Sequence, residues 1–131
     1  MQKIKYKIIL PASSNTEPTE IEISAAKLLA NYFRANVEFI PRTSTKTADF
    51  LIQNTVWELK SPTGKGKRNI QHQFSRAMLQ SKNIIIDARK SKMRTERLIR
   101  ELSSQSKRTK SLKGLLLITK SGKVVDFFED I

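Results

Sequence analysis

The first part of the chain combines a short alternating segment with a longer amphipathic one. Apolar and polar residues alternate over residues 4–8, which predicts a half-exposed strand that ends at Pro11. Apolar residues then recur at helical spacing, which predicts a helix that runs to about Arg34, with Thr19 or Thr16 as its N-cap. The inward stripe of this helix would consist of Ile21, Ala25, Leu28, Leu29 and Tyr32.

Residues 48–60 predict a β-hairpin, after a short strand at 37–40. If Gln53 and Asn54 form its loop, the two residue numbers of each cross-strand pair add up to 107, so Asp49 lies opposite Glu58. Opposed side chains lie about 4.5–5.5 Å apart at Cβ, and Lys60 shares their face because side chains repeat every second residue. Both faces also carry apolar residues, so we expect a central hairpin covered on both sides.

The second half predicts two further helices and three strands. Asn69 follows a glycine- and lysine-rich loop and is a candidate helix cap. The elements expected after it are a helix at 70–81, a β-branched buried strand at 84–86, a basic amphipathic helix at 95–106, and a hairpin of strands 115–119 and 124–128. The order predicts one α/β domain over residues 1–131, with a mixed central sheet flanked by helices.

Charge and composition point to a polyanionic partner. The formal net charge is +13 in 131 residues, and phosphates neutralised by basic side chains release counterions and so favour binding. No cysteine is present and His72 is the only histidine, so thiolate sites and histidine clusters are excluded and any metal should be a hard, oxygen-bound ion. No apolar run suits a signal peptide or a membrane span, so we expect a cytoplasmic protein, or cargo that another segment delivers.

An aspartate followed after nine residues by a Glu-x-Lys motif, here Asp49 and Glu58-Leu59-Lys60, resembles the PD-(D/E)xK nuclease superfamily. The predicted order over residues 19–87, α-β-β-β-α-β, is similar to the restriction-endonuclease-like core, with a C-terminal helix and β-hairpin added. Within that superfamily the chain most resembles the C-terminal tRNA-nuclease domains of contact-dependent growth inhibition toxins and related phage-borne modules. That likeness lies in the segments 48–52 (ADFLI), 57–62 (WELKSP) and 80–87 (QSKNIIID); it departs from the pattern at Ala48, where proline is usual.

The resemblance implies roles for these residues. Asp49 and Glu58 would hold Mg²⁺, and Lys60 would orient the attacking water or stabilise the developing charge. A further acid often comes from the first helix, for which Glu22 is the candidate and Glu20 the fallback. Some nucleases of this group cleave RNA without metal; Asp49, Glu58 or His72 would then be the base, with Thr119 assisting. A structural ion pair of Lys60 with either acid is the non-catalytic alternative.

Basic residues predict the nucleic-acid contacts. Residues 82–113 contain eleven lysines and arginines against three acids, and such a density favours backbone phosphates as ligands. Gln80, seven residues after Gln73 on one helix face, is a candidate for hydrogen bonds to the carboxylates or a base, or a plain surface residue. The predicted nucleic-acid-binding residues are Lys65, Lys67, Arg68, Gln80, Lys92, Arg94 and Arg97.

These features predict an endonuclease that cleaves RNA, with tRNA as the expected substrate. A toxin with this activity implies an acidic immunity protein that covers the basic surface. Two alternatives remain open at this point: a structure-specific DNA endonuclease of a mobile element, and a non-catalytic nucleic-acid-binding domain.

Overall fold

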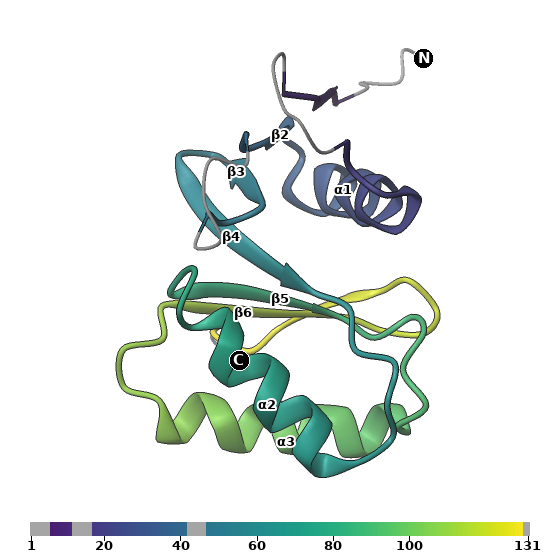
Figure 1. Ribbon diagram of the computed structural model, residues 1–131, viewed down its shortest axis with the longest axis vertical. Coiled ribbons are helices and arrows are strands. Elements are labelled where there is room, and N and C mark those ends of the chain that lie inside the picture. Colours follow the sequence, from purple (N-terminus) through teal and green to yellow (C-terminus); the bar gives the residue numbers. More distant parts are fainter. Residues whose placement is uncertain (1–5, 12–16, 42–46, 130–131) are drawn as a thin grey trace.

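A computed structural model describes residues 6–11, 17–41 and 47–129 of the chain, and Figure 1 shows its arrangement. Within these residues seven strands form one mixed sheet, in the spatial order β1-β2-β3-β4-β5-β6-β7. This confirms the predicted α/β class and element order. The elements are β1 (Ile8–Ile9), α1 (Glu20–Phe33), β2 (Val37–Phe39), β3 (Phe50–Ile52), β4 (Thr55–Lys60), α2 (Lys67–Ala77), β5 (Asn83–Asp87), α3 (Thr95–Arg108), β6 (Gly114–Ile118) and β7 (Val124–Asp126).

Helix α1 begins at a capping box. The Thr19 hydroxyl accepts a hydrogen bond from the backbone N–H of Glu22, and the Glu22 carboxylate accepts one from the N–H of Thr19. The predicted cap at Thr19 is therefore confirmed, whereas Thr16 lies outside the described residues. The predicted inward stripe was partly wrong, because Tyr32 is exposed and the buried positions are Ala25, Ala26, Leu29 and Ala30.

The β3–β4 hairpin has the predicted loop. Gln53 and Asn54 both adopt positive φ angles, 48° and 67°, as a two-residue type I′ turn requires. Phe50 pairs with Trp57, Leu51 with Val56 and Ile52 with Thr55, which confirms the predicted register. This hairpin is central, but Val56 is 40% exposed, so the expectation that both faces are covered was wrong at this end.

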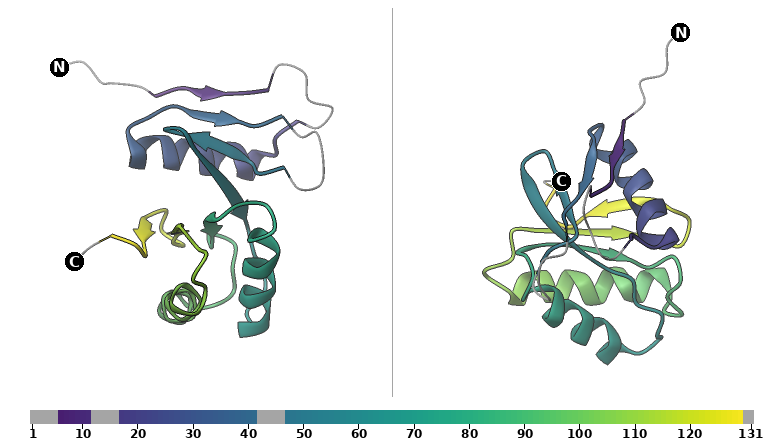
Figure 2. Two further views of the ribbon diagram at one scale, coloured as in Figure 1. Left: turned by 90° about the vertical axis from the view of Figure 1, so that its left-hand side faces the viewer. Right: turned by 45° about the horizontal axis from the view of Figure 1, so that its top comes forward.

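Helices cover opposite faces of the sheet (Figures 1 and 2). The core beneath α1 includes Leu29, Phe50, Trp57 and Leu59. Helices α2 and α3 enclose a second core on the other face, built around Ile70, Phe74, Ile84, Ile86, Leu98, Leu102, Leu115 and Leu117. Leu59 and Ile84 thus mark opposite faces of the sheet.

The loops that follow β4 and β5 meet at one edge of the sheet. These strands are parallel, so their carboxyl ends lie at the same edge. The Gly64 carbonyl oxygen accepts hydrogen bonds from the Ser91 hydroxyl and from the Lys92 N–H, both at 3.2 Å. Sites in α/β folds form at such an edge because the loops there are free to vary.

Helix α2 starts earlier than predicted. Its first residue is Lys67 and its N-cap is Gly66, so the expectation of a start at Ile70 capped by Asn69 was wrong. No acidic residue and no apolar residue precede Ile70 within the helix, so the hydrophobic pattern did not indicate the first turn. Within the described part of the chain, no helix has the length and apolar character that crossing a membrane requires.

Candidate active site

Asp49, Glu58 and Lys60 lie together at the carboxyl end of β4. The Lys60 ammonium Nζ is 3.2 Å from Glu58 Oε2, and the Glu58 and Asp49 side chains share a hydrogen bond. Asp49 is 9% exposed and Glu58 is 4% exposed. The structure therefore brings together the two acids and the lysine that the hairpin register predicts.

Asp49 also forms hydrogen bonds to β4 just before β3 begins. Its carboxylate Oδ2 accepts a hydrogen bond from the Leu59 N–H at 2.8 Å. Its own N–H donates to the Trp57 carbonyl oxygen at 3.1 Å, although Trp57 is already the partner of Phe50. The pairing register thus shifts at Asp49, so the expectation that Asp49 lies directly opposite Glu58 in the ladder was wrong, although their side chains still meet.

Burial and like charge act together on Glu58. Removal from water raises the pKa of Glu58, and the neighbouring Asp49 raises it further through its charge and a hydrogen bond, while Lys60 lowers it. The resulting pKa is about 8. Its atom Oε1 is buried and has no hydrogen-bond partner among the described residues. At neutral pH the pair therefore carries a proton that a cation in its place would displace.

Strand register fixes the side of the sheet on which the site lies. Glu58 pairs with Ile84 and Lys60 pairs with Ile86, and paired residues of parallel strands point to the same face. Both isoleucines belong to the core beneath α2 and α3. Glu58 and Lys60 thus lie on the α2–α3 side of the sheet, opposite α1.

Glu22 is placed differently from the other three predicted catalytic residues. It lies in the first turn of α1, where its carboxylate takes part in the capping box with Thr19. Glu20, the fallback, is in the same turn and is exposed. Over the described ranges, no three acidic or histidine side chains come close enough to hold a metal ion together, so Glu22 does not complete a set with Asp49 and Glu58.

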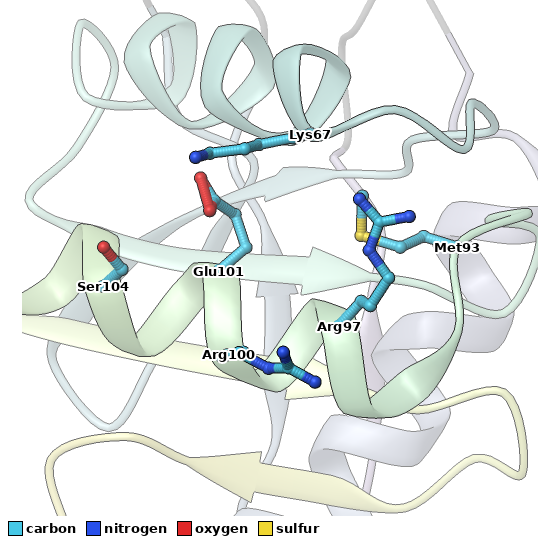
Figure 3. A pocket seen from close by; sticks show the side chains of 6 residues that line it. All are labelled: Lys67, Met93, Arg97, Arg100, Glu101 and Ser104. Atoms are coloured by element: carbon cyan, nitrogen blue, oxygen red, sulfur yellow. The ribbon is translucent and has the colours of Figure 1, made fainter.

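The predicted basic residues gather beside this edge. A cavity of about 600 Å³ lies where the two loops meet, lined by Lys65, Gly66, Lys92, Met93, Arg94 and Arg97. A smaller cavity of about 290 Å³ lies between α2 and α3, lined by Lys67, Met93, Arg97, Arg100, Glu101 and Ser104 (Figure 3). Five of the seven predicted nucleic-acid contacts line one or both cavities.

Two predicted contacts lie elsewhere. Arg68 is exposed in the first turn of α2 and lines neither cavity. Gln80 follows the other end of α2, which at about 1.5 Å per helical residue puts it roughly 20 Å from Lys67. Arg100 and Glu101 are the charged lining residues outside the predicted set, because a contact between two helices leaves no local pattern in the sequence.

His72 and Thr119, the further residues proposed for a metal-free reaction, lie on α2 and after β6. His72 is exposed on α2. Thr119 shapes the turn between β6 and β7, where its hydroxyl accepts a hydrogen bond from the Lys123 N–H at 3.1 Å and lies 3.1 Å from the Ser121 hydroxyl. Gln73 is half-buried on α2.

A second charged cluster ties α1 to the loop after β5. The buried Asp87 carboxylate binds Arg89 through both oxygens, from Nε at 2.9 Å and from an Nη at 2.6 Å. Arg89 also donates to the Ser24 hydroxyl and to the Ile21 carbonyl oxygen of α1. Asp87 raises the pKa of Arg89, so the guanidinium stays charged. This cluster holds the loop that continues to Lys92.

The chain was compared with known protein families. Residues 46–124 match the model of a family described as the contact-dependent growth inhibition CdiA C-terminal domain. The chain belongs to this family. The match to the CdiA C-terminal domain includes Asp49, Glu58, Lys60 and the residues of both cavities, and it does not extend to Glu22.

A solved structure shares the fold of this CdiA C-terminal domain. It is described as a CdiA-CT/CdiI toxin and immunity complex from Burkholderia pseudomallei. The match covers 89% of this chain and 96% of the other, with a TM-score of 0.64 and 21% sequence identity. No curated protein matches the chain by sequence. At this identity the likeness establishes the fold and does not by itself assign an activity.

Proposed function

We propose that this CdiA C-terminal domain is a toxin nuclease that cleaves RNA phosphodiester bonds, with tRNA as its substrate, at a PD-(D/E)xK-type site. The single observation that carries the proposal is the cluster of Asp49, Glu58 and Lys60. Two adjoining carboxyl groups with almost no solvent exposure are costly to bury, and here they lie at the carboxyl edge of the sheet beside a basic cavity.

Asp49 and Glu58 fit a hard divalent cation. The Glu58 pKa of about 8 and the buried Oε1, which has no hydrogen-bond partner among the described residues, indicate that Lys60 alone does not compensate the charge of both carboxylates. Mg²⁺ commonly binds through only one or two carboxylates, with waters and substrate phosphates as its other ligands, so a set of two acids is sufficient. When bound, Mg²⁺ would supply charge that polarises a phosphate and acidifies a coordinated water.

Lys60 is the proposed catalytic cation. It lies 3.2 Å from Glu58 Oε2 and is partly exposed, so its ammonium is accessible from the edge of the sheet. There it would hold the attacking water or stabilise charge on the phosphate oxygens in the transition state. Glu58, whose Oε2 is 3.2 Å from Nζ, holds this ammonium in position. Glu22 is left out of this mechanism because it caps α1.

The basic cavities would bind the substrate backbone. Lys65 and Lys92 lie on two loops joined through Gly64, Arg94 is the N-cap of α3, and Arg97 is in the first turn of α3, so their backbones are held close to one another. Contacts with phosphate oxygens orient a nucleic acid without reading its bases. This surface also suits an acidic immunity protein, which we propose as the second partner.

The proposal is tested by incubating the chain with tRNA and with plasmid DNA, each in Mg²⁺ or in EDTA. We expect cleavage of tRNA that requires Mg²⁺ and is lost in Lys60→Ala, while Lys120→Ala, which removes an exposed lysine on a turn, cleaves normally. Cleavage of tRNA in EDTA would indicate a metal-free mechanism instead of the metal-dependent one. Cleavage of DNA alone would indicate the DNA endonuclease, and no cleavage of either would indicate a binding domain.

A further inference from the structure

The two basic cavities adjoin each other. Both are lined by Met93 and Arg97, so one continues into the next along the junction of α2 and α3. We call the combined surface the seam groove; its charged lining residues are Lys65, Lys67, Lys92, Arg94, Arg97, Arg100 and Glu101. Six basic side chains thus face a single acid, so the groove is suited to an anion longer than one phosphate group.

The smaller cavity extends the groove away from the sheet edge. Figure 3 shows Lys67 extending from α2 toward Glu101 on α3, while Arg97 and Arg100 leave α3 in different directions. Glu101 is held by Gln71 of α2, which donates to its Oε1 at 2.9 Å. This contact joins the two helices, so the basic residues on both helices keep a fixed spacing. A rigid array of cations binds a polyanion at a lower entropic cost than free side chains do.

Both helices begin at the groove. Gly66 and Arg94, the N-caps of α2 and α3, line the larger cavity, and neither makes a side-chain cap hydrogen bond. The first backbone N–H groups of two helices therefore add their partial positive charge to that of the lysines and arginines. Backbone N–H groups at helix N-termini bind phosphate oxygens readily, which favours phosphates over the dispersed carboxylates of an acidic protein.

We propose that the seam groove binds RNA phosphates beyond the scissile one, so that efficient cleavage requires a substrate several nucleotides longer than the bond that is cut. The identity of the polyanion as RNA rests on the proposed function. Six residues separate Lys60 from Lys67, so the groove begins close to the catalytic lysine in sequence and leads away from it along α2 and α3. A short oligonucleotide would occupy the site without filling the groove.

Binding to 2′-O-methyl RNA in EDTA tests this proposal without cleavage, because EDTA removes the metal that the water mechanism needs and the methyl group blocks attack by the 2′-oxygen. Fluorescein-labelled oligomers of 4 and of 20 nucleotides are titrated with the protein over a range of salt concentrations, and anisotropy gives Kd. Arg97→Gln removes the arginine that lines both cavities, and Arg100→Gln removes an arginine that lines only the smaller of the two. Arg76→Gln is the matched control, an exposed arginine of α2 outside both cavities. Arg97→Lys tests whether charge alone is sufficient.

We expect each groove variant to weaken binding of the 20-mer by up to about fivefold and to lower the slope of log K against log salt by about 0.7 to 1. Binding of the 4-mer should change less than twofold, and Arg76→Gln should match the wild type. An equal loss of 20-mer affinity in Arg76→Gln, or unchanged 20-mer binding in Arg97→Gln, would overturn the proposed role of the groove. If polyglutamate bound as tightly as the 20-mer and with the same dependence on Arg97, the seam groove would be assigned to an acidic protein instead of RNA.

The cleavage assay separates failure of the groove from failure of the proposed function. If the chain is not a nuclease, tRNA stays intact while the variants still show the length-dependent binding loss. If the chain is a nuclease without a phosphate groove, Arg97→Gln cleaves tRNA with an unchanged KM. The groove predicts a higher KM for tRNA in Arg97→Gln at an unchanged kcat.

Discussion

The Asp49 carboxylate accepts a hydrogen bond from the Leu59 backbone N–H at 2.8 Å. Asp49 immediately precedes β3, which begins at Phe50, while β4 continues to Lys60, so a side chain takes the place of the missing strand partner. The same carboxylate raises the pKa of Glu58. Asp49 thus connects the end of the sheet to the cluster of charged groups, and substitutions can separate its structural contribution from its chemical one.

Asp49→Asn and Asp49→Ala should differ in stability and agree in activity. Asparagine keeps an oxygen that accepts from the Leu59 N–H and removes the charge beside Glu58, so we expect stability close to or above that of the wild type. Alanine leaves the N–H unpaired, at a cost of about 1–3 kcal/mol. Urea unfolding measures the difference, and tRNA cleavage should be lost in both. An active Asp49→Asn variant would show that cleavage does not require the negative charge of Asp49.

Stability should fall with rising pH because of Glu58. Its pKa is about 8 in the folded protein and 4.5 for an unperturbed glutamate, so the folded state holds the proton more tightly and loses stability as pH rises from about 4.5 to about 8. Glu58→Gln cannot ionise, so the wild-type free energy of unfolding in EDTA should drop relative to the variant across this range, by an amount on the order of a few kcal/mol. Parallel pH profiles would show that Glu58 titrates normally.

Mg²⁺ should compete with the Glu58 proton. The proton must leave before the carboxylate binds a cation, so apparent affinity should fall about tenfold for each pH unit below about 8 and level off above it. Calorimetry in buffers of different ionisation enthalpy should detect release of close to one proton at pH 7. A Mg²⁺ affinity that does not change between pH 6 and pH 8, or that survives in Glu58→Gln, would contradict the assigned ligands.

Arg89 should stabilise the fold through Asp87. Arg89→Ala leaves a fully buried carboxylate without its cation, with an expected loss of about 3–5 kcal/mol. The double variant Asp87→Asn with Arg89→Ala should lose less than the sum of the two single variants, because it leaves no charge behind. Denaturant unfolding of the four proteins gives the coupling energy, and strictly additive losses would show that the two residues do not act as a pair.

Local signals predicted much of the fold. The positive φ angles of Gln53 and Asn54 suit a two-residue hairpin loop, and that loop sets the register that brings Glu58 toward Asp49. The uninterrupted isoleucines of β5 indicated a buried parallel strand. These predictions succeeded because turn chemistry and side-chain periodicity act over a few residues.

Other features depend on contacts that the sequence does not display. The shift at Asp49 lies just before Phe50, the first residue of β3, and nothing in the hairpin pattern marks that position. Glu101 meets Gln71 only because α2 and α3 pack together. Glu22 is different, since the Thr-x-x-Glu spacing from Thr19 is itself a capping signal and favoured a structural role for this acid.

Single-turnover cleavage of tRNA in Mg²⁺ by Glu58→Gln tests the central claim most directly. Glu38→Gln, which removes an exposed glutamate of β2, is the matched control for the change in charge. We predict that Glu58→Gln folds and binds tRNA in EDTA as the wild type does. Its cleavage rate should be lower by about 100-fold or more, while Glu38→Gln cleaves normally. A folded Glu58→Gln protein that cleaves tRNA at the wild-type rate would contradict the account.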